Sequence, residues 1–124
     1  MQLIIGGAYQ GKLDFVRTSH PGLSETQCSP DQPQLDLSTD VIIGLHLWVL
    51  AQLRAGRDPL QELEAVRDEL QGKIVISDDI SCGVVPIDPE LRRWRETTGR
   101  VLAWVSQWSE QVNRLFCGIA SRIK

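Results

Sequence analysis

The stretch "LIIGGAYQGKL" at residues 3–13 is an apolar run that leads directly into a glycine-rich segment. A short apolar run before glycines is typical of a buried strand, and a helix is expected to begin near Gly11. Gly6, Gly11 and Lys12 match the phosphate-binding pattern G-x-x-x-x-G-K-[ST] up to its last position, where Leu13 replaces the hydroxyl residue. The stretch therefore predicts a strand, a phosphate-binding loop (P-loop) and a helix.

In such a loop, backbone N–H groups and the following helix N-terminus converge on phosphate oxygens, while the lysine reaches the outer phosphates. We therefore predict an ATP or GTP site with Lys12 as a catalytic residue, and the alternative is an ordinary glycine turn. The predicted nucleotide-binding residues are Gly6, Gly7, Ala8, Tyr9, Gln10, Gly11 and Lys12. Because Leu13 cannot ligate the Mg²⁺ that a hydroxyl usually holds, the metal is expected to be held weakly.

Composition limits the remaining possibilities. The 124 residues are 42% hydrophobic and 23% charged, which predicts one soluble domain, residues 1–124, with a single core. A net charge of −3 without a basic run argues against nucleic acid as the main partner. No signal peptide or membrane span is expected. The three cysteines form no C-x-x-C motif, which favours free thiols in a reducing cytoplasm.

Polar and apolar segments alternate along the middle of the chain. Residues 18–38 read as a long polar loop, typical of a functional loop, a lid or a mobile segment. The segment "STDVIIGLHLWVLAQLRAG" at 38–56 predicts a helix that is apolar on nearly every face, and therefore buried in the fold or against a second subunit. A further helix is expected to begin at Asp58-Pro59 and to end near Gly72.

The segment "KIVISDD" at 73–79 predicts a central parallel strand that ends in two carboxylates. Open α/β sheets place ligand-binding groups at the carboxyl ends of strands, so we predict Asp78 and Asp79 as Mg²⁺ ligands. Asp79 is also a candidate catalytic residue, able to accept a hydroxyl proton. The alternative is a solvated turn after the strand.

The longest helix is expected from Asp88-Pro89, followed by a strand and a short return strand at the C-terminus. Together these elements predict an α/β fold of the P-loop NTPase type, with a small, mostly parallel sheet and flanking helices. His20 is expected on the surface and His46 in the core or an interface. Cys82 and Cys117 read as buried structural thiols, and Trp104, off the main apolar stripe of the long helix, predicts a subunit contact.

Three stretches resemble the bifunctional adenosylcobinamide kinase/adenosylcobinamide-phosphate guanylyltransferase family of cobalamin biosynthesis. The segment "IIGGAYQGK" is similar to that family's strand and P-loop, and "VISDDISCGVVP" to its segment with Asn-Glu and Gly-Ile-Val-Pro. The segments "RRWRETTGRV" and "CGIASRIK" resemble its Phe-Arg-Asp…Gly-Arg-Val helix and its C-terminal Ser-Gly-Ile…Lys. The resemblance implies a P-loop α/β domain that assembles as a homotrimer and transfers a phosphoryl group from ATP or GTP to adenosylcobinamide.

The sequence also departs from that family. Leu13 replaces the P-loop hydroxyl, Asp78-Asp79 replace Asn-Glu, and the segment with the family's guanylylated histidine is absent. Neither His20 nor His46 matches that histidine's motif, so we expect no covalent guanylyl intermediate. Two functions remain open: an adenosylcobinamide kinase, or a catalytically degenerate protein that binds a nucleotide or a partner protein and regulates the pathway.

Overall fold

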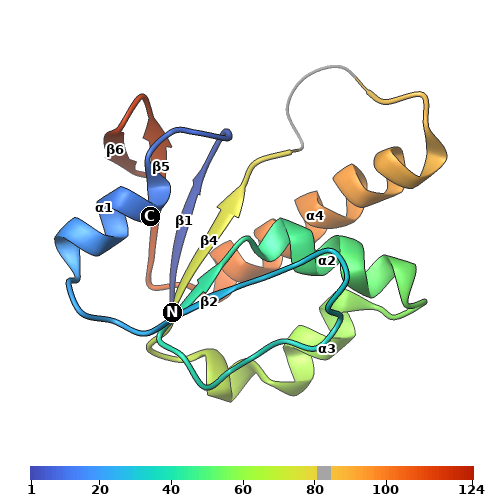
Figure 1. The fold of residues 1–124 in the computed structure, drawn as a ribbon, viewed down its shortest axis with the longest axis horizontal. Coiled ribbons are helices and arrows are strands. Elements are labelled where there is room, and N and C mark those ends of the chain that lie inside the picture. The colour runs from blue at the N-terminus through green and yellow to red at the C-terminus, as the bar shows by residue number, and fades with distance from the viewer. Residues whose placement is uncertain (81–84) are drawn as a thin grey trace.

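One sheet of six strands organises the part of the chain that the structure describes, residues 1–80 and 85–124 (Figure 1). In this computed structural model the strands lie in the order β2-β3-β4-β1-β5-β6. Every neighbouring pair is parallel except β5 and β6, which form an antiparallel hairpin. The predicted α/β fold with a mostly parallel sheet is therefore confirmed.

The elements follow one another in this order along the chain: β1 (Gln2–Gly6), α1 (Lys12–Ser19), β2 (Glu25–Gln27), β3 (Val41–Ile43), α2 (Leu45–Arg54), α3 (Pro59–Ala65), the short 3-10 helix η1 (Arg67–Leu70), β4 (Ile74–Asp78), α4 (Pro89–Trp108), β5 (Gln111–Phe116) and β6 (Ile119–Arg122). No helix among these described residues is long and apolar enough to cross a membrane.

The helices cover the sheet from both sides (Figure 1). Successive residues of a strand point to opposite faces, and in β1 Leu3 joins the core beneath α2, α3 and α4 while Ile4 joins the core beneath α1. Strands β1 and β4, in the middle of the sheet, are buried on both faces, as expected of the interior of a parallel sheet.

The chain leaves β1 and β4 in opposite directions. From β1 it runs through α1 to the β2 edge, whereas from β4 it runs through α4 to β5 on the far side of β1. Adjacent parallel strands whose connections diverge leave a crevice at their carboxyl ends, where open α/β sheets bind ligands. The topology thus points to the ends of β1 and β4 as the place for a site.

The helix predicted for residues 40–55 is wrong in its first part. Val41–Ile43 form β3, and only Leu45–Arg54 form the helix α2. The two elements meet at Gly44, whose φ of 81° is a left-handed conformation that glycine adopts without strain. The three β-branched residues before this glycine suit a buried strand, and their burial between β2 and β4 outweighs the helical pattern.

The expected polar loop at 18–38 also contains structure. Residues Glu25–Gln27 add the edge strand β2 to β3. Further along, Trp48 Nε1 and Gln52 Nε2 of α2 both donate hydrogen bonds to the Pro33 carbonyl, and two leucines of the segment pack on the core. The segment is therefore attached to α2 rather than standing free of the fold.

The starts of α3 and α4 were predicted correctly. Asp58 accepts a hydrogen bond from Leu60 N, and Asp88 accepts bonds from Glu90 N and Leu91 N, so both cap the helices that begin with the following proline. The Asp58 helix ends at Ala65, earlier than expected, and the 3-10 helix η1 continues the chain to Leu70.

The two features that suggested a second subunit are accounted for within one chain. Trp48 and Val49 of α2 are fully buried against the sheet and the other helices, so the apolar helix needs no partner to cover it. Trp104 is half-buried against the same core and contacts Trp108. The predicted homotrimer is neither supported nor contradicted by this burial.

Candidate functional site

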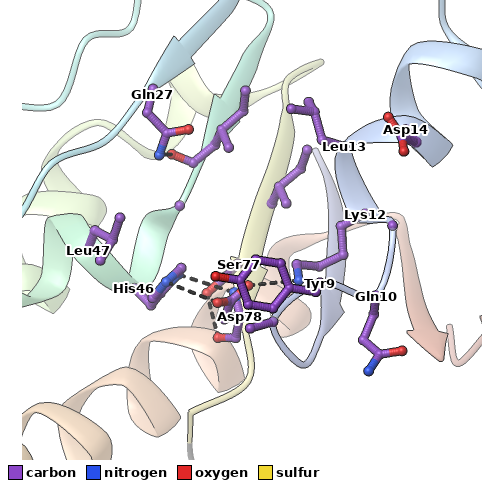
Figure 2. Close-up of a pocket in the computed structure, with 15 residues that line it drawn as sticks. Tyr9, Gln10, Lys12, Leu13, Asp14, Gln27, His46, Leu47, Ser77 and Asp78 are labelled. Carbon is purple, nitrogen blue, oxygen red and sulfur yellow. Dashed lines mark hydrogen bonds and ion pairs between the residues drawn. The ribbon is translucent and has the colours of Figure 1, made fainter. Parts of the chain in front are cut away.

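A pocket lies where the topology places it, at the carboxyl ends of the strands (Figure 2). Its volume is about 780 Å³. The glycine-rich loop, the start of α1, the ends of β2, β3 and β4, and the start of α2 all contribute to it. The lining residues are Ala8, Tyr9, Gln10, Gly11, Lys12, Leu13, Asp14, Gln27, Ile43, Gly44, His46, Leu47, Ile76, Ser77 and Asp78.

The glycine-rich loop begins at a position where only glycine fits. A Cβ placed on Gly6 would lie 2.6 Å from the Leu115 carbonyl oxygen of the neighbouring strand β5. The same register sets Gly6 beside Asp78 of β4, and Asp79 N donates to the Gly6 carbonyl at 2.8 Å. Strand pairing therefore brings the loop and the two aspartates together.

The loop ends in the N-terminus of α1. Gly11 is the N-cap, and no side chain caps the first backbone N–H groups of the helix. An uncapped helix N-terminus combines free N–H donors with the positive end of the helix dipole, which suits an anion. Tyr9, at the tip of the loop, is fully exposed and has a φ of 61°.

The C-terminal hairpin holds the other side of the loop. Gln10 accepts two backbone hydrogen bonds from the turn between β5 and β6: its carbonyl accepts from Gly118 N at 3.0 Å, and its side-chain oxygen accepts from Cys117 N. Cys117 and Gly118 both have positive φ, as in a two-residue hairpin turn. The turn thereby fixes the backbone of Gln10.

Lys12 is the buried cation of the site. Its side chain is 7% exposed, and its Nζ donates to the Gly7 carbonyl at 2.6 Å and to Asp78 Oδ1 at 2.7 Å. Asp78 is 27% exposed and faces the pocket from the end of β4. Lys12 therefore has its charge balanced by Asp78 before any ligand binds.

His46 completes this cluster from the first turn of α2. Its Nδ1 accepts a hydrogen bond from Asp78 N at 3.1 Å, and its Nε2 lies 3.5 Å from Asp78 Oδ2. Burial lowers the pKa of His46, more than the Asp78 carboxylate raises it, and Lys12 lowers it further. A neutral ring that accepts at Nδ1 carries its proton on Nε2, facing Asp78 Oδ2.

Helix α4 supports His46 from behind. The Trp94 ring stacks on the imidazole, with the ring centroids 6.2 Å apart, and Trp94 Nε1 donates to the His46 carbonyl at 2.7 Å. Lys12, Asp78, His46 and Trp94 thus form a continuous series of contacts from the glycine-rich loop to α4.

Asp79 has a different environment from Asp78. Its carboxylate accepts a hydrogen bond at 3.0 Å from Arg114 Nη2 of β5 and is only 12% exposed. Of the two predicted metal ligands, Asp78 is the one that lines the pocket. Within the described ranges no group of three or more His, Cys, Asp or Glu side chains could hold a metal ion. A metal here would depend on other ligands, such as water or phosphate.

The structure brings together much of what the sequence singled out and adds to it. The predicted loop residues from Ala8 to Lys12 line one pocket with Asp78, and His20 is exposed as expected. His46 is buried as predicted, but its contact with Asp78 was missed. The expected burial of Cys117 is wrong, because the residue lies in the exposed hairpin turn. Cys82 lies outside the described residues.

The side chains at the β2 and β3 end of the pocket were not predicted at all. Gln27, Ile43 and Leu47 line it, yet they come from a polar segment and from an apolar run whose residues looked like core. The Val-Ile-Ile-Gly sequence at 41–44, read as a strand that turns at glycine, could have indicated Ile43 and Leu47 but not Gln27.

Comparison of the chain with protein-family models and with curated proteins found no match. The function proposed below therefore depends on the geometry of the pocket and on the sequence patterns.

Proposed function

We propose that the chain binds ATP or GTP, with the phosphates on the loop Gly6–Lys12, which then acts as a P-loop. One observation carries the proposal: the uncapped N-terminus of α1 and the buried Lys12 ammonium face a single pocket at the carboxyl ends of β1 and β4. Backbone N–H groups and a lysine directed at one space are the donors that a polyphosphate requires.

The chemistry that fits this arrangement is phosphoryl transfer from the nucleotide to a hydroxyl. The acceptor oxygen forms a bond to the γ-phosphorus while the bond from that phosphorus to the bridging oxygen breaks, and a nucleoside diphosphate leaves. Lys12 and the loop N–H groups would stabilise the charge on the phosphate oxygens. Asp78 is a better candidate than Asp79 to accept the hydroxyl proton, since Asp78 lines the pocket and Asp79 does not.

Mg²⁺ fits the site as a metal held jointly by protein and nucleotide. Mg²⁺ in nucleotide sites usually has one or two carboxylate ligands besides phosphates and water, and it neutralises phosphate charge when bound. Asp78 would supply the carboxylate, because it lines the pocket whereas Asp79 does not. Leu13 offers no hydroxyl, so we expect a weaker dependence of binding on Mg²⁺ than in a typical P-loop protein.

The resemblance to adenosylcobinamide kinase/guanylyltransferases suggests adenosylcobinamide as the acceptor and the cytoplasm as the place of action. We also propose a homotrimer on that basis, and light scattering that gave the 13.9 kDa monomer mass at micromolar concentration would contradict it. No covalent guanylyl intermediate is expected, since the only histidine of the pocket, His46, is buried against Asp78 and Trp94. Retention of label from GTP labelled at the α-phosphate after denaturation would show otherwise.

A second candidate is a nucleotide-binding regulatory protein without catalysis. The ion pair between Lys12 and Asp78 favours it, because the pair must open or shift before Lys12 can reach a phosphate. Turnover of ATP or GTP in the presence of an acceptor separates the two candidates.

Titration calorimetry with ATP and GTP tests the shared claim. Lys12→Ala and Lys12→Met should weaken binding roughly ten- to a hundredfold, because each removes a charge-assisted hydrogen bond. Lys124→Ala is the matched control, since Lys124 donates to Ser106 and Gln107 carbonyls at the end of α4. Equal affinity in wild type and both Lys12 variants, or no binding by the wild type, would remove the site.

A further inference from the structure

The pocket has two chemically different halves. The half beside the glycine-rich loop carries Lys12, Asp78 and His46. The other half, over the ends of β2 and β3, is lined by the aliphatic side chains of Leu13, Ile43, Leu47 and Ile76. The phosphates of a nucleotide would bind in the first half, and the aliphatic side chains of the second half offer them no hydrogen-bond donor.

The aliphatic half presents apolar surface to the pocket. Leu13, Ile43 and Leu47 are each only half-buried, although Leu13 and Ile43 pack on the core beneath α1 and Leu47 on the core beneath α2. They come from three different elements, α1, β3 and α2, and line the same pocket. Apolar surface left open in a concave site is favourable only when a ligand covers it.

Gln27 places one oriented polar group at the edge of this half. Its Nε2 donates to the Cys28 carbonyl at 3.1 Å and to the Ile43 carbonyl at 3.4 Å. Because both of these partners are acceptors, the amide nitrogen must face them, and this fixes the direction of Oε1. Oε1 accepts no hydrogen bond from the described residues, and Figure 2 shows the Gln27 amide across the pocket from Leu13.

We propose that this half is the subsite for the hydroxyl-bearing end of the phosphoryl acceptor, and that the part of the acceptor it takes is uncharged and mainly apolar. The apolar part of the acceptor packs on Leu13, Ile43 and Leu47, and an O–H or N–H of the same molecule donates to Gln27 Oε1. The role of this ligand as the phosphoryl acceptor rests on the proposed function, but its binding to the subsite can be tested without a nucleotide.

The same subsite accounts for Leu13. A Ser or Thr at this position would supply a metal ligand, whereas leucine supplies aliphatic surface beside Ile43 and Ile76. The residue that departs from the phosphate-binding pattern is therefore the residue through which α1 contributes to the aliphatic wall.

The test uses cyclohexylmethanol as the probe, which is uncharged, apolar and carries one hydroxyl. The protein is labelled with ¹³C at its Leu and Ile methyl groups, and the probe is titrated with and without saturating inorganic tripolyphosphate. The methyl resonances of Leu13, Ile43 and Leu47 are expected to shift together and to report one dissociation constant. Cyclohexanecarboxylate, with the same ring and a negative charge, is expected to bind more weakly.

Two substitutions, one in α1 and one in α2, then perturb the aliphatic half of the pocket. Leu13→Thr and Leu47→Thr should each raise the dissociation constant of cyclohexylmethanol about three- to tenfold through lost apolar contact. Leu23→Thr is the matched control, because Leu23 is half-buried on the same core as Leu13 but is not among the residues that line the pocket. Gln27→Met should raise the constant about threefold by removing the acceptor oxygen.

Each outcome has a separate meaning. If the wild type binds tripolyphosphate and the probe shifts other methyl groups or none, the subsite is wrong while nucleotide binding stands. If tripolyphosphate does not bind but the three methyl groups respond to the probe, the subsite stands and the proposed function fails. Equal probe affinity in the wild type, Leu13→Thr and Leu47→Thr would overturn the assignment of the aliphatic half as the acceptor subsite.

Discussion

The ion pair between Lys12 and Asp78 leads to a prediction with two opposite effects in one variant. In Asp78→Asn the Lys12 ammonium stays buried (7% exposed) but loses the opposite charge, and it has only neutral partners, the Gly7 carbonyl and the amide oxygen of the new side chain. Removing one member of a buried pair costs about 3–5 kcal/mol, and the partial exposure of Asp78 reduces this to roughly 2 kcal/mol. We therefore expect the melting temperature to fall by roughly 6–10 °C.

The same substitution should tighten the binding of polyphosphate. Lys12 no longer has to leave a carboxylate, and one negative charge is removed from the pocket. At an effective dielectric constant of about 20, this charge repels the ligand by a few kcal/mol at most. We therefore expect the affinity for tripolyphosphate without Mg²⁺ to rise about tenfold. With Mg²⁺ present the gain should shrink, because Asp78 is the proposed carboxylate ligand.

Chemical denaturation and titration calorimetry measure the two effects in the same samples. Asp14→Asn is the control, since Asp14 also lines the pocket but is exposed and makes no ion pair among the described residues. It should leave the free energy of unfolding within about 0.5 kcal/mol of the wild type. If Asp78→Asn were as stable as Asp14→Asn, the pair would contribute nothing in solution and the reasoning would be refuted.

Three further predictions concern the loop and the core. Gly6→Ala should lower the free energy of unfolding by at least about 2 kcal/mol in chemical denaturation, because its methyl group would lie 2.6 Å from a β5 carbonyl oxygen. Gly7→Ala should be nearly neutral in the same assay, because the nearest contact of its methyl group would be 3.7 Å away. Gln10→Met removes the side-chain bond to Cys117 N and should weaken ATP binding about three- to tenfold with little change in stability, and unchanged affinity would show that the hairpin does not hold the loop. Burial raises the pKa of Cys28 from 9.0 to about 12, so the stability from the protonated thiol is present below pH 9.0 and is lost as pH rises toward 12. As the pH is raised from 8.5 to roughly 10.5, the free energy of unfolding measured in urea should therefore fall less in Cys28→Ala than in the wild type.

Local patterns predicted the parts of the fold that depend on a few adjacent residues. The glycines after an apolar run indicated β1, the loop and the start of α1, and Asp-Pro pairs located the starts of α3 and α4. The β-branched run at 74–76 indicated the central strand β4. Each of these signals is a conformational preference or a cap that acts within one turn or one strand.

Features that depend on distant partners could not be predicted in this way. His46 looked like any buried residue of an apolar helix, because its role is set by Asp78, 32 residues further along the chain. Strand β3 was hidden in a continuous apolar run, and its pairing with β2 and β4 decided its conformation. Gln27 acquired its place in the pocket only through the edge strand β2, which is three residues long.

A ¹H–¹⁵N NMR titration of the wild type with inorganic tripolyphosphate locates the residues that bind phosphate. Backbone amide resonances of residues 8–12 should show the largest shifts, and in Lys12→Met the midpoint of these shifts should move to a roughly ten- to a hundredfold higher tripolyphosphate concentration. Another cavity, whose lining includes Arg57, Arg93 and Arg100 together with Asp58 and Glu96, provides an internal comparison for non-specific anion binding. Largest shifts around those arginines, or shifts at residues 8–12 with the same midpoint in the wild type and Lys12→Met, would contradict the proposal that this loop is the phosphate site.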